Sequence, residues 1–299
     1  MENPNEQAAQ QSPKTYKVII AVNTPHGVGY FADSEGRFLF RKQFEKVSCF
    51  FEGLAPVEQN GKWGYINTQG EVIIPCIYDA AESFHEDLAP VKQNGKWGFI
   101  NTKGEVIAPC IYDFATWFSE GLARVRQNDK YGFINPKGEV VAPCIYDWVA
   151  WKFSEGLAQV KQNGKWGFIN PKGEVIAPCI YDKEAWFSEG LARVMQNGKW
   201  GFINTKGEEI APCIYDDAGH FSEGLAQVKL GDWENDKDGY INTKGWVVIP
   251  YIYDVAWDFS EGLAGVEQNG KGSIINKEGK VIVAECDVRE THWSKVEME

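Results

Sequence analysis

Apolar and polar residues alternate along most of the chain, in short runs separated by turn residues. In residues 157–162, leucine and valine alternate with polar side chains, which is the periodicity of a half-buried strand. Asn163-Gly164 follows. This pair is typical of a two-residue hairpin, because a type I′ turn needs two residues with positive φ. Residues 166–169 then predict the returning strand.

A second turn and a third strand complete this pattern. In Asn170-Pro171-Lys172-Gly173, asparagine caps the turn, proline suits its second position and glycine closes it. Residues 174–177 predict the third strand. Pro178 cannot donate to a β ladder, so it ends this strand or lies on a sheet edge. Residues 179–182 are candidates for a short fourth strand. No segment repeats its apolar residues every 3.6 positions, so we expect almost no helix.

The same unit recurs along the chain. The Glu-Gly-Leu-Ala block has its second residue 34 to 38 positions after the previous one, at Gly53, Asp87, Gly121, Gly156, Gly190, Gly224 and Gly262. A degenerate eighth copy precedes these, with Phe50-Phe51-Glu52-Gly53 in place of Phe-Ser-Glu-Gly. Such self-similarity predicts an all-β repeat protein of seven to eight β-meanders, each of about 34 residues.

Two architectures fit this repeat. Three to four strands per copy make a blade-sized unit, so we expect a β-propeller-like ring. The alternative is an open β-solenoid, in which atypical end copies act as caps. We expect a single repeat domain at 16–291, between a disordered N-terminal tail at 1–15 and a C-terminal tail at 292–299. Its units lie near 16–52, 53–86, 87–120, 121–155, 156–189, 190–223, 224–261 and 262–291.

Positions that stay constant from copy to copy are interpreted as scaffold. The tryptophan of pairs such as Trp166-Gly167 is predicted to be a core wedge, and the glycine a place where a neighbouring backbone or ring approaches closely. One cysteine slot recurs in Pro-Cys-Ile-Tyr-Asp, but Tyr251 fills it in a later copy. A packing position tolerates that change and a ligand position does not, so we expect reduced, half-buried cysteines.

The recurring carboxylates are predicted to be turn residues. An active site needs one constellation, whereas these acids recur in copy after copy, so we expect them to accept backbone N–H bonds. The four histidines lie far apart in the sequence, and no nucleotide-binding or hydrolase motif occurs. We therefore expect no enzyme activity, no zinc site and no cofactor. The acids in question are Glu155, Glu189, Glu223, Asp147, Asp182 and Asp216.

These motifs resemble a known family. Lys-Trp-Gly-Phe-Ile-Asn, followed by Lys-Gly-Glu-Val-Ile-x-Pro and Phe-Ser-Glu-Gly-Leu-Ala, is similar to the WG (or KWG) repeat proteins of bacteria. The resemblance covers residues 53 to about 276. It implies a β-rich, propeller-like repeat used as a binding or accessory module. It carries over no catalytic residue, and the first and last copies match it only loosely.

Composition narrows the expected partners and location. Apolar residues make up 43% of the chain and 12 residues are tryptophan, which is enough for a buried core. The formal net charge of −12 disfavours direct binding to nucleic acid or to an anionic membrane. No apolar run approaches the ~18 residues that span a bilayer. The N-terminus lacks the features of a secretory signal, so we expect a cytoplasmic protein.

The segment between Tyr-Asp and Phe-Ser-Glu-Gly differs most between copies yet keeps large aromatic residues. Loops carry function on rigid scaffolds, and tryptophan is favoured at binding hot spots. We therefore predict a non-catalytic scaffold that mediates protein–protein interaction through these loops. The competing interpretation is that the same side chains fill gaps between blades. The candidate binding residues are Trp117, Trp148, Trp151, Trp186, His220 and Trp257.

The sequence leaves two further hypotheses open, a carbohydrate-binding module and a calcium-binding loop. Tryptophan platforms also suit a carbohydrate or cell-wall (lectin-like) module, in which several copies bind one glycan each. Because the loops vary, and a repeated glycan favours identical loops, a protein partner is preferred. A longer hairpin carries Glu234, Asp236 and Asp238 before Gly239, an alternation of oxygen ligands typical of calcium loops. It lacks the usual first aspartate and closing acid, so a solvated hairpin tip is the competing interpretation.

Overall fold

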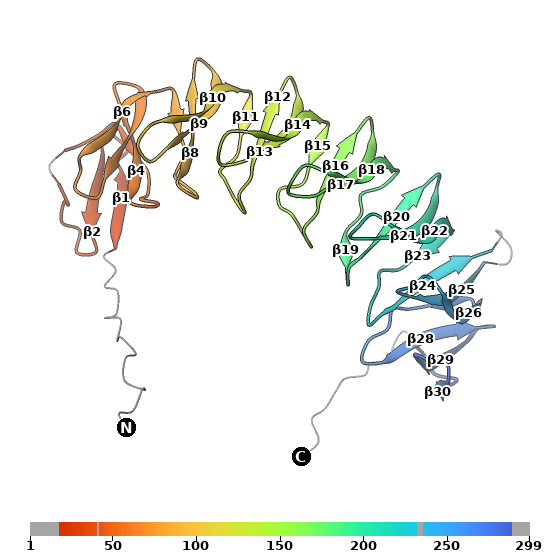
Figure 1. Cartoon of the computed structure of the whole chain (residues 1–299). Coiled ribbons are helices and arrows are strands. Elements are labelled where there is room, and N and C mark those ends of the chain that lie inside the picture. Colours follow the sequence, from red (N-terminus) through yellow and green to blue (C-terminus); the bar gives the residue numbers. More distant parts are fainter. Residues whose placement is uncertain (1–17, 41, 232–235, 289–299) are drawn as a thin grey trace, which may run out of the picture. The chain divides into compact units, whose positions relative to one another are not determined.

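Strands joined by tight turns make up the protein throughout the computed structural model, which describes residues 18–40, 42–231 and 236–288 (Figure 1). Those residues contain no helix, which confirms the all-β prediction. They accordingly include no helix that could cross a membrane. The chain divides into two compact units, one with residues 1–123 and 136–138 and the other with 124–135 and 139–299.

The first unit begins with a two-stranded antiparallel sheet of β1 (Ile19–Asn23) and β2 (Gly29–Asp33). Two four-stranded sheets follow, each with its strands side by side in chain order. The first contains β3 (Lys46–Val47), β4 (Leu54–Gln59), β5 (Lys62–Asn67) and β6 (Val72–Tyr78). The second contains β7 (Ala80–Ala81), β8 (Leu88–Gln93), β9 (Lys96–Asn101) and β10 (Val106–Tyr112).

Further four-stranded antiparallel sheets follow in the same order. One contains β11 (Phe114–Ala115), β12 (Ala123–Gln127), β13 (Lys130–Ile134) and β14 (Val140–Tyr146). The next two contain β15 (Trp148–Val149), β16 (Ala158–Gln162), β17 (Lys165–Ile169) and β18 (Val175–Tyr181), then β19 (Phe187–Ser188), β20 (Leu191–Gln196), β21 (Lys199–Asn204) and β22 (Glu209–Tyr215). The last two contain β23 (Asp217–Ala218), β24 (Leu225–Leu230), β25 (Lys237–Asn242) and β26 (Val247–Tyr253), then β27 (Val255–Ala256), β28 (Leu263–Gln268), β29 (Lys271–Asn276) and β30 (Val281–Ala284).

Both predicted turns form as their sequences require. Asn163 and Gly164 have φ values of 52° and 79°, as a type I′ hairpin turn needs. In the second turn, the Asn170 side-chain oxygen accepts N–H bonds from Lys172 at 2.9 Å and from Glu174 at 3.0 Å. These local bonds end one strand and begin the next.

The third strand differs from the prediction. β18 continues through Pro178 to Tyr181, so the separate fourth strand predicted at 179–182 is wrong. Proline fits because β18 is an edge strand with a break in register, where no ladder bond is needed. The actual fourth strand is the variable segment, which pairs with the next copy: Trp148 lies opposite Lys161. Most variable segments are thereby fixed to the following sheet, whereas residues 183–186 form no strand and β19 (Phe187–Ser188) begins after them.

The glycine after tryptophan is required by a close backbone approach, as predicted. A Cβ atom on Gly167 would lie 2.6 Å from the carbonyl oxygen of Ala177 and 2.8 Å from the nitrogen of Cys179. Real Cβ atoms do not come so close to backbone. The break in the register of β18 therefore presses its backbone onto β17 at the one residue without a side chain.

The core lies between consecutive sheets and is centred on the aromatic residue two positions after the tryptophan. Phe168 is 3% exposed. It belongs to a buried cluster with Leu157 and Tyr181 of its own sheet and with Val194 and Ile203 of the next one. Because each copy contributes the same residues, the same cluster recurs from sheet to sheet.

The predicted core wedge, Trp166, is only half-buried, which corrects that prediction. It lies directly opposite Lys161 on the neighbouring strand, and the Lys161 ammonium lies 4.8 Å from a ring centroid of Trp166. The Trp148 ring packs edge-on against the Trp166 ring, with the ring centroids 5.3 Å apart. The long cross-strand side chain keeps the indole on the sheet surface. The exception among these tryptophans is Trp200, which is 8% exposed.

We expect Phe168→Ala to cost about 3–5 kcal/mol of unfolding free energy, as large core truncations do. Trp166→Ala should cost clearly less, because one face of its ring is covered by a flexible lysine alone. Urea unfolding followed by circular dichroism measures both, with exposed Trp246→Ala as the control for loss of an indole. Equal costs for Phe168 and Trp166 would contradict this assignment of the core.

Ring closure is tested by deleting the last copy from Gly262 onward. A propeller should lose soluble, cooperative folding, because an incomplete ring leaves two apolar faces in water. An open array has nearest-neighbour interfaces alone, so it should keep a sharp transition, with a midpoint and m-value reduced in proportion to the lost surface. The predicted ring is abandoned if the shortened chain unfolds sharply in this way.

Candidate binding surface

The glutamates of the Phe-Ser-Glu-Gly turns connect one copy to the next. The Glu189 carboxylate accepts N–H bonds from Glu223 at 2.8 Å and from Gly224 at 2.9 Å. Glu223 itself has a φ of 53°, a strained value for a residue with a side chain. The carboxylate of one copy therefore stabilises the strained turn of the following copy. Glu52 does the same for Glu86.

The aspartates after tyrosine have an equivalent role. Asp182 accepts a hydrogen bond from the Lys165 ammonium of its own sheet and another, at 3.1 Å, from the Gly198 N–H in the next hairpin. Asp147 makes the corresponding bonds to Lys130 and Gly164. The prediction that these acids accept backbone N–H bonds is confirmed for Asp147 and Asp182. It does not hold for Asp216, whose Oδ2 atom has no hydrogen-bond partner among the described residues. The bonded Lys130 and Lys165 ammonium groups hold the pKa values of Asp147 and Asp182 below the ordinary value of 3.8.

Three of the predicted loop tryptophans are largely exposed. Trp117, Trp151 and Trp186 have exposed fractions of 55%, 71% and 53%. All three belong to the variable segments, close to the phenylalanine that begins the Phe-Ser-Glu-Gly turn. Water-exposed indoles of this extent are costly to leave uncovered and are typical of binding surfaces.

Two other predicted site residues, Trp148 and Trp257, are packed against neighbouring residues. Trp148 is half-buried against Trp166. Trp257 is also half-buried, with its ring beside Gly265, where even a Cβ atom would lie within 3.4 Å of it. Its carbonyl oxygen accepts a bond from the Tyr240 hydroxyl at 2.7 Å. For these two, the partial burial favours the competing interpretation that tryptophan fills gaps between sheets.

His220 lies in a small charged group on the surface. Partial loss of hydration and the nearby Arg193 charge lower the pKa of His220, while Asp258 acts in the opposite direction. The Arg193 guanidinium donates to the carbonyl oxygen of Ala218 and lies 4.1 Å from a ring centroid of Trp200. Arg193 therefore anchors the loop backbone beside an exposed imidazole.

The structure argues against the calcium loop. Asp238 is 2% exposed and points inward, where it accepts bonds from Gln227 Nε2 and from the Ala256 N–H, each at 2.8 Å. A loop ligand must instead face the ion. Glu234 lies outside the described residues. Across the described ranges, no three His, Cys, Asp or Glu side chains are grouped as metal ligands.

The repeated cysteines occupy a packing slot, as predicted. Cys179 is a free, half-buried thiol whose Sγ lies 3.9 Å from the carbonyl oxygen of Val160. Burial raises the pKa of this thiol, so it is a poor nucleophile at neutral pH.

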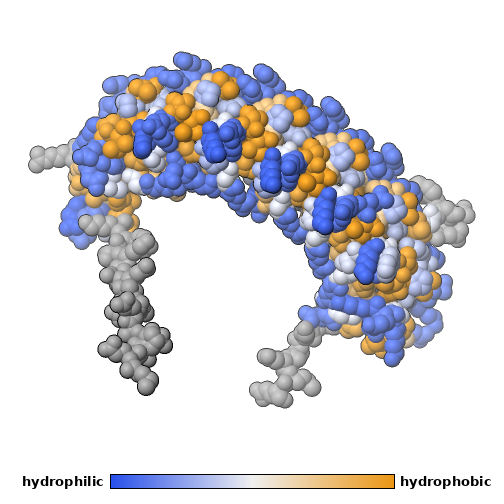
Figure 2. All heavy atoms as spheres, in the orientation of Figure 1, coloured by the Kyte–Doolittle hydropathy of each residue, from blue (hydrophilic) through white to orange (hydrophobic). Residues whose placement is uncertain are grey.

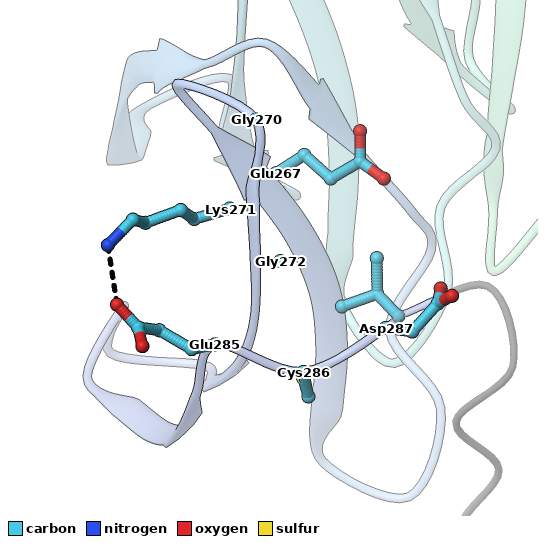
Figure 3. Close-up of a pocket in the computed structure, with 8 residues that line it drawn as sticks. Glu267, Gly270, Lys271, Gly272, Glu285, Cys286 and Asp287 are labelled. Atoms are coloured by element: carbon cyan, nitrogen blue, oxygen red, sulfur yellow. Dashed lines mark hydrogen bonds and ion pairs between the residues drawn. The ribbon is translucent and has the colours of Figure 1, made fainter.

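The last copy contains a pocket where the pattern breaks down. Gly272 stands in place of the tryptophan, and the space of about 520 Å³ beside it is lined by the end of the described chain, including Cys286. Figure 3 shows Lys271 paired with Glu285 at 2.5 Å on one side and Glu267 pointing to the other. The pocket is open to solvent. Residues 289–299 follow its last lining residue, Val288, in the sequence and lie outside the described residues.

Sequence reasoning missed a second exposed surface, on the edge strands. In most copies the valine that begins the third strand and the isoleucine before its tyrosine are exposed. Within each unit, apolar patches alternate with hydrophilic ones in Figure 2. The alternation of apolar and polar residues does not predict the break in register of the third strand. The sequence therefore did not indicate that these side chains are exposed. They include Val72, Ile77, Val106, Ile111, Val140, Ile145, Val175, Ile180, Val247 and Ile252.

In the first unit, aromatic side chains from successive copies form a continuous row. The rings of Phe51 and His85 lie 5.3 Å apart, and those of His85 and Trp117 lie 5.5 Å apart. Phe51 is 44% exposed. The arrangement offers a strip of ring surface and contains no nucleophile–base pair.

Sheets of identical topology, a glycine-dependent bulge and exposed variable loops define an all-β repeat protein. The family described as WG containing repeat matches residues 31–63, 63–97, 97–131, 131–166, 166–200, 200–232 and 239–271. The chain belongs to this family, which confirms the resemblance.

Comparisons with curated proteins and with solved structures do not extend this family assignment. No curated protein matches the chain. A crystal structure of a eukaryotic initiation factor is 12% identical, with a TM-score of 0.40, and the match covers 91% of this chain and 85% of the other. Hsv2 of Kluyveromyces lactis is 8% identical, with a TM-score of 0.30, over 75% of this chain and 90% of the other. Likeness at this level identifies neither ring closure nor a function.

The lowered carboxyl pKa values predict how stability depends on pH. The folded pKa of Asp182 lies below 3.8, so its ionised form stabilises the fold fully above that value, and this contribution is lost as pH falls through the folded pKa. We expect urea midpoints to fall below about pH 4. An Asp147→Asn/Asp182→Asn double variant should have a lower midpoint at pH 7 and a smaller acid-induced fall. Exposed Glu184→Gln should show neither change, and an unaltered acid response in the double variant would contradict this role.

Proposed function

We propose that this protein is a non-catalytic scaffold that binds a protein partner through its variable, tryptophan-bearing loops. The observation that carries the proposal is the exposure of Trp117, Trp151 and Trp186, each of which presents more than half of its surface to water. Large aromatic side chains supply much of the binding energy at protein interfaces when a partner covers them.

The loops that carry these tryptophans are fastened to the sheets. Gln159 Nε2 donates to the carbonyl oxygen of Ala185 at 2.9 Å, next to Trp186. Arg124 Nη1 donates to the carbonyl oxygen of Val149 at 3.4 Å, near Trp151. A loop held in one conformation loses little entropy on binding, so the exposed rings are preorganised for a partner.

The differences between loops favour a protein over a repeated small ligand. Trp151 has the Arg124 guanidinium 3.5 Å from a ring centroid, whereas Trp117 contacts His85. A glycan chain presents the same sugar to each copy and favours identical platforms. The carbohydrate alternative rests on the exposed rings themselves, because indole faces also stack on sugars.

The proposal is tested by retention of partners on the immobilised full-length chain. Proteins retained from native lysate are identified and their binding measured directly, in parallel with a glycan array. We expect each of Trp117→Ala, Trp151→Ala and Trp186→Ala to weaken binding by roughly 10-fold or more where the partner covers that ring. The matched control is Trp246→Ala, which removes an indole that is 64% exposed but lies outside the variable loops.

Two results would reject a protein scaffold that acts through these loops. One is a triple variant of the loop tryptophans that retains its protein partners with wild-type affinity. The other is selective glycan binding with no retained protein, which would favour the carbohydrate alternative. Urea unfolding of each variant confirms that losses of binding do not reflect unfolding.

A further inference from the structure

Two copies in the first unit depart from the turn sequence of the others. Where the later copies have Phe-Ser-Glu-Gly, residues 50–53 are Phe-Phe-Glu-Gly and residues 84–87 are Phe-His-Glu-Asp. Phe51 and His85 therefore stand in the position of a serine. The turn does not need a ring there, because the later copies form it with serine, at 118–121, 153–156, 187–190, 221–224 and 259–262.

The two substituted rings come together with the indole of Trp117. The ring centroids of Phe51 and His85 lie 5.3 Å apart, and those of His85 and Trp117 lie 5.5 Å apart. Phe51 and Trp117 are exposed and His85 is half-buried. These three residues, the aromatic row, belong to successive copies and present contiguous ring surface to water. Such surface is typical of interaction sites.

Exposed carboxylates accompany the aromatic row. The Glu52 carboxylate accepts the Glu86 N–H at 2.8 Å, and the Glu86 carboxylate accepts the Gly121 N–H at 2.9 Å. These acids therefore bridge the turns of the copies that carry the rings. Asp87 adds an exposed acid at a position where the other copies have glycine. The ion pairs formed among the described residues include none of these three acids.

The chain supplies no cation of its own to this surface. The turn segments 48–54, 82–88 and 116–122 contain no lysine or arginine. Across the described ranges, no ammonium or guanidinium group lies over a ring of the aromatic row. An uncovered ring face is electron-rich, and the neighbouring carboxylates add negative charge, so this surface attracts a cation.

The second unit contains an example of each contact that such a cation would make. The Lys277 ammonium lies 3.0 Å from the Glu223 carboxylate of a Phe-Ser-Glu-Gly turn. The Arg124 guanidinium lies 3.5 Å from a ring centroid of Trp151, an exposed loop indole. In the second unit, therefore, the chain's own cations contact a turn glutamate and a loop indole. The equivalent groups of the first unit are left for a cation from outside.

We propose that the aromatic row binds an extended basic segment of a protein partner, with arginine side chains at alternate positions. A planar guanidinium stacks on a ring of the row and donates to a neighbouring carboxylate at the same time. Alternate side chains on one face of an extended strand lie roughly 6.7 Å apart, close to the spacing of the rings. The inference rests on the proposed function, because it names the chemistry of the partner.

The experiment measures how tightly the full-length chain binds a labelled peptide in which three arginines alternate with serine. Fluorescence anisotropy is recorded at about pH 8, where imidazole is ordinarily uncharged. The main variant, Phe51→Ser/His85→Ser, restores the serine of the other copies and keeps the formal charge. We expect this variant and Trp117→Ala to bind the peptide about 5-fold or more weakly, because cation–π contacts are lost. Exposed Trp246→Ala should bind it normally.

The contribution of charge is measured separately. Asp87→Gly removes one acid beside the row and restores the glycine of the other copies, so it should fold and bind the peptide more weakly. Exposed Glu184→Gln removes a charge in the second unit and should leave binding unchanged. A peptide with citrulline, the uncharged analogue of arginine, should bind the wild type about 10-fold or more weakly. Urea unfolding of each variant confirms that it is folded.

Three results would overturn the inference. One is equal binding of the arginine peptide by the wild type and by Phe51→Ser/His85→Ser, which would indicate attraction by net charge alone. The others are equal binding of the citrulline peptide and no measurable binding of the arginine peptide. In each case the scaffold proposal stands if the immobilised chain still retains a protein partner through Trp151 or Trp186. A chain that neither binds the peptide nor retains a protein would reject both.

Discussion

Backbone contact through glycine is the constraint on which the stacking of the sheets depends. A Cβ atom on Gly207 would lie 2.0 Å from the carbonyl oxygen of Ile176 in the preceding sheet, and one on Gly173 would lie 2.0 Å from that of Val141. Both glycines also have φ near +78°. No other residue satisfies both conditions, so these two turns can rest directly on the backbone of the preceding sheet. At Gly104 and Gly279 the equivalent approach is to an isoleucine side chain instead.

Recurring polar bonds also join one copy to the next. The Glu189 carboxylate reaches the next strained turn, and Asp182 reaches the next hairpin. Phe168 then fills the space between the two sheets. Carboxylate bonds and aromatic packing thus act together at the same junction between consecutive sheets.

Variation between copies is confined to places that this framework does not constrain. The position of Gln159 tolerates arginine, proline or glycine in other copies, and the loop it anchors changes with it. Beside Gln159, residues 183–186 form no strand, and the exposed Trp186 lies in this irregular segment. The variable segments can thus differ from copy to copy while the strands and turns of the framework stay the same.

The sequence by itself determined the all-β class, the turns and the acceptor role of the acids. These depend on short-range rules, such as the positive φ of Asn163-Gly164, that act within a few residues. Tertiary structure alone decided that Trp166 stays half-buried and that Trp148 and Trp257 pack while Trp151 and Trp186 are exposed. It also decided that Gln159 bonds the Ala185 carbonyl oxygen through Nε2. Exposure and hydrogen-bond pairing depend on which residues of another sheet lie opposite, and alternation along one strand carries no information about that neighbour.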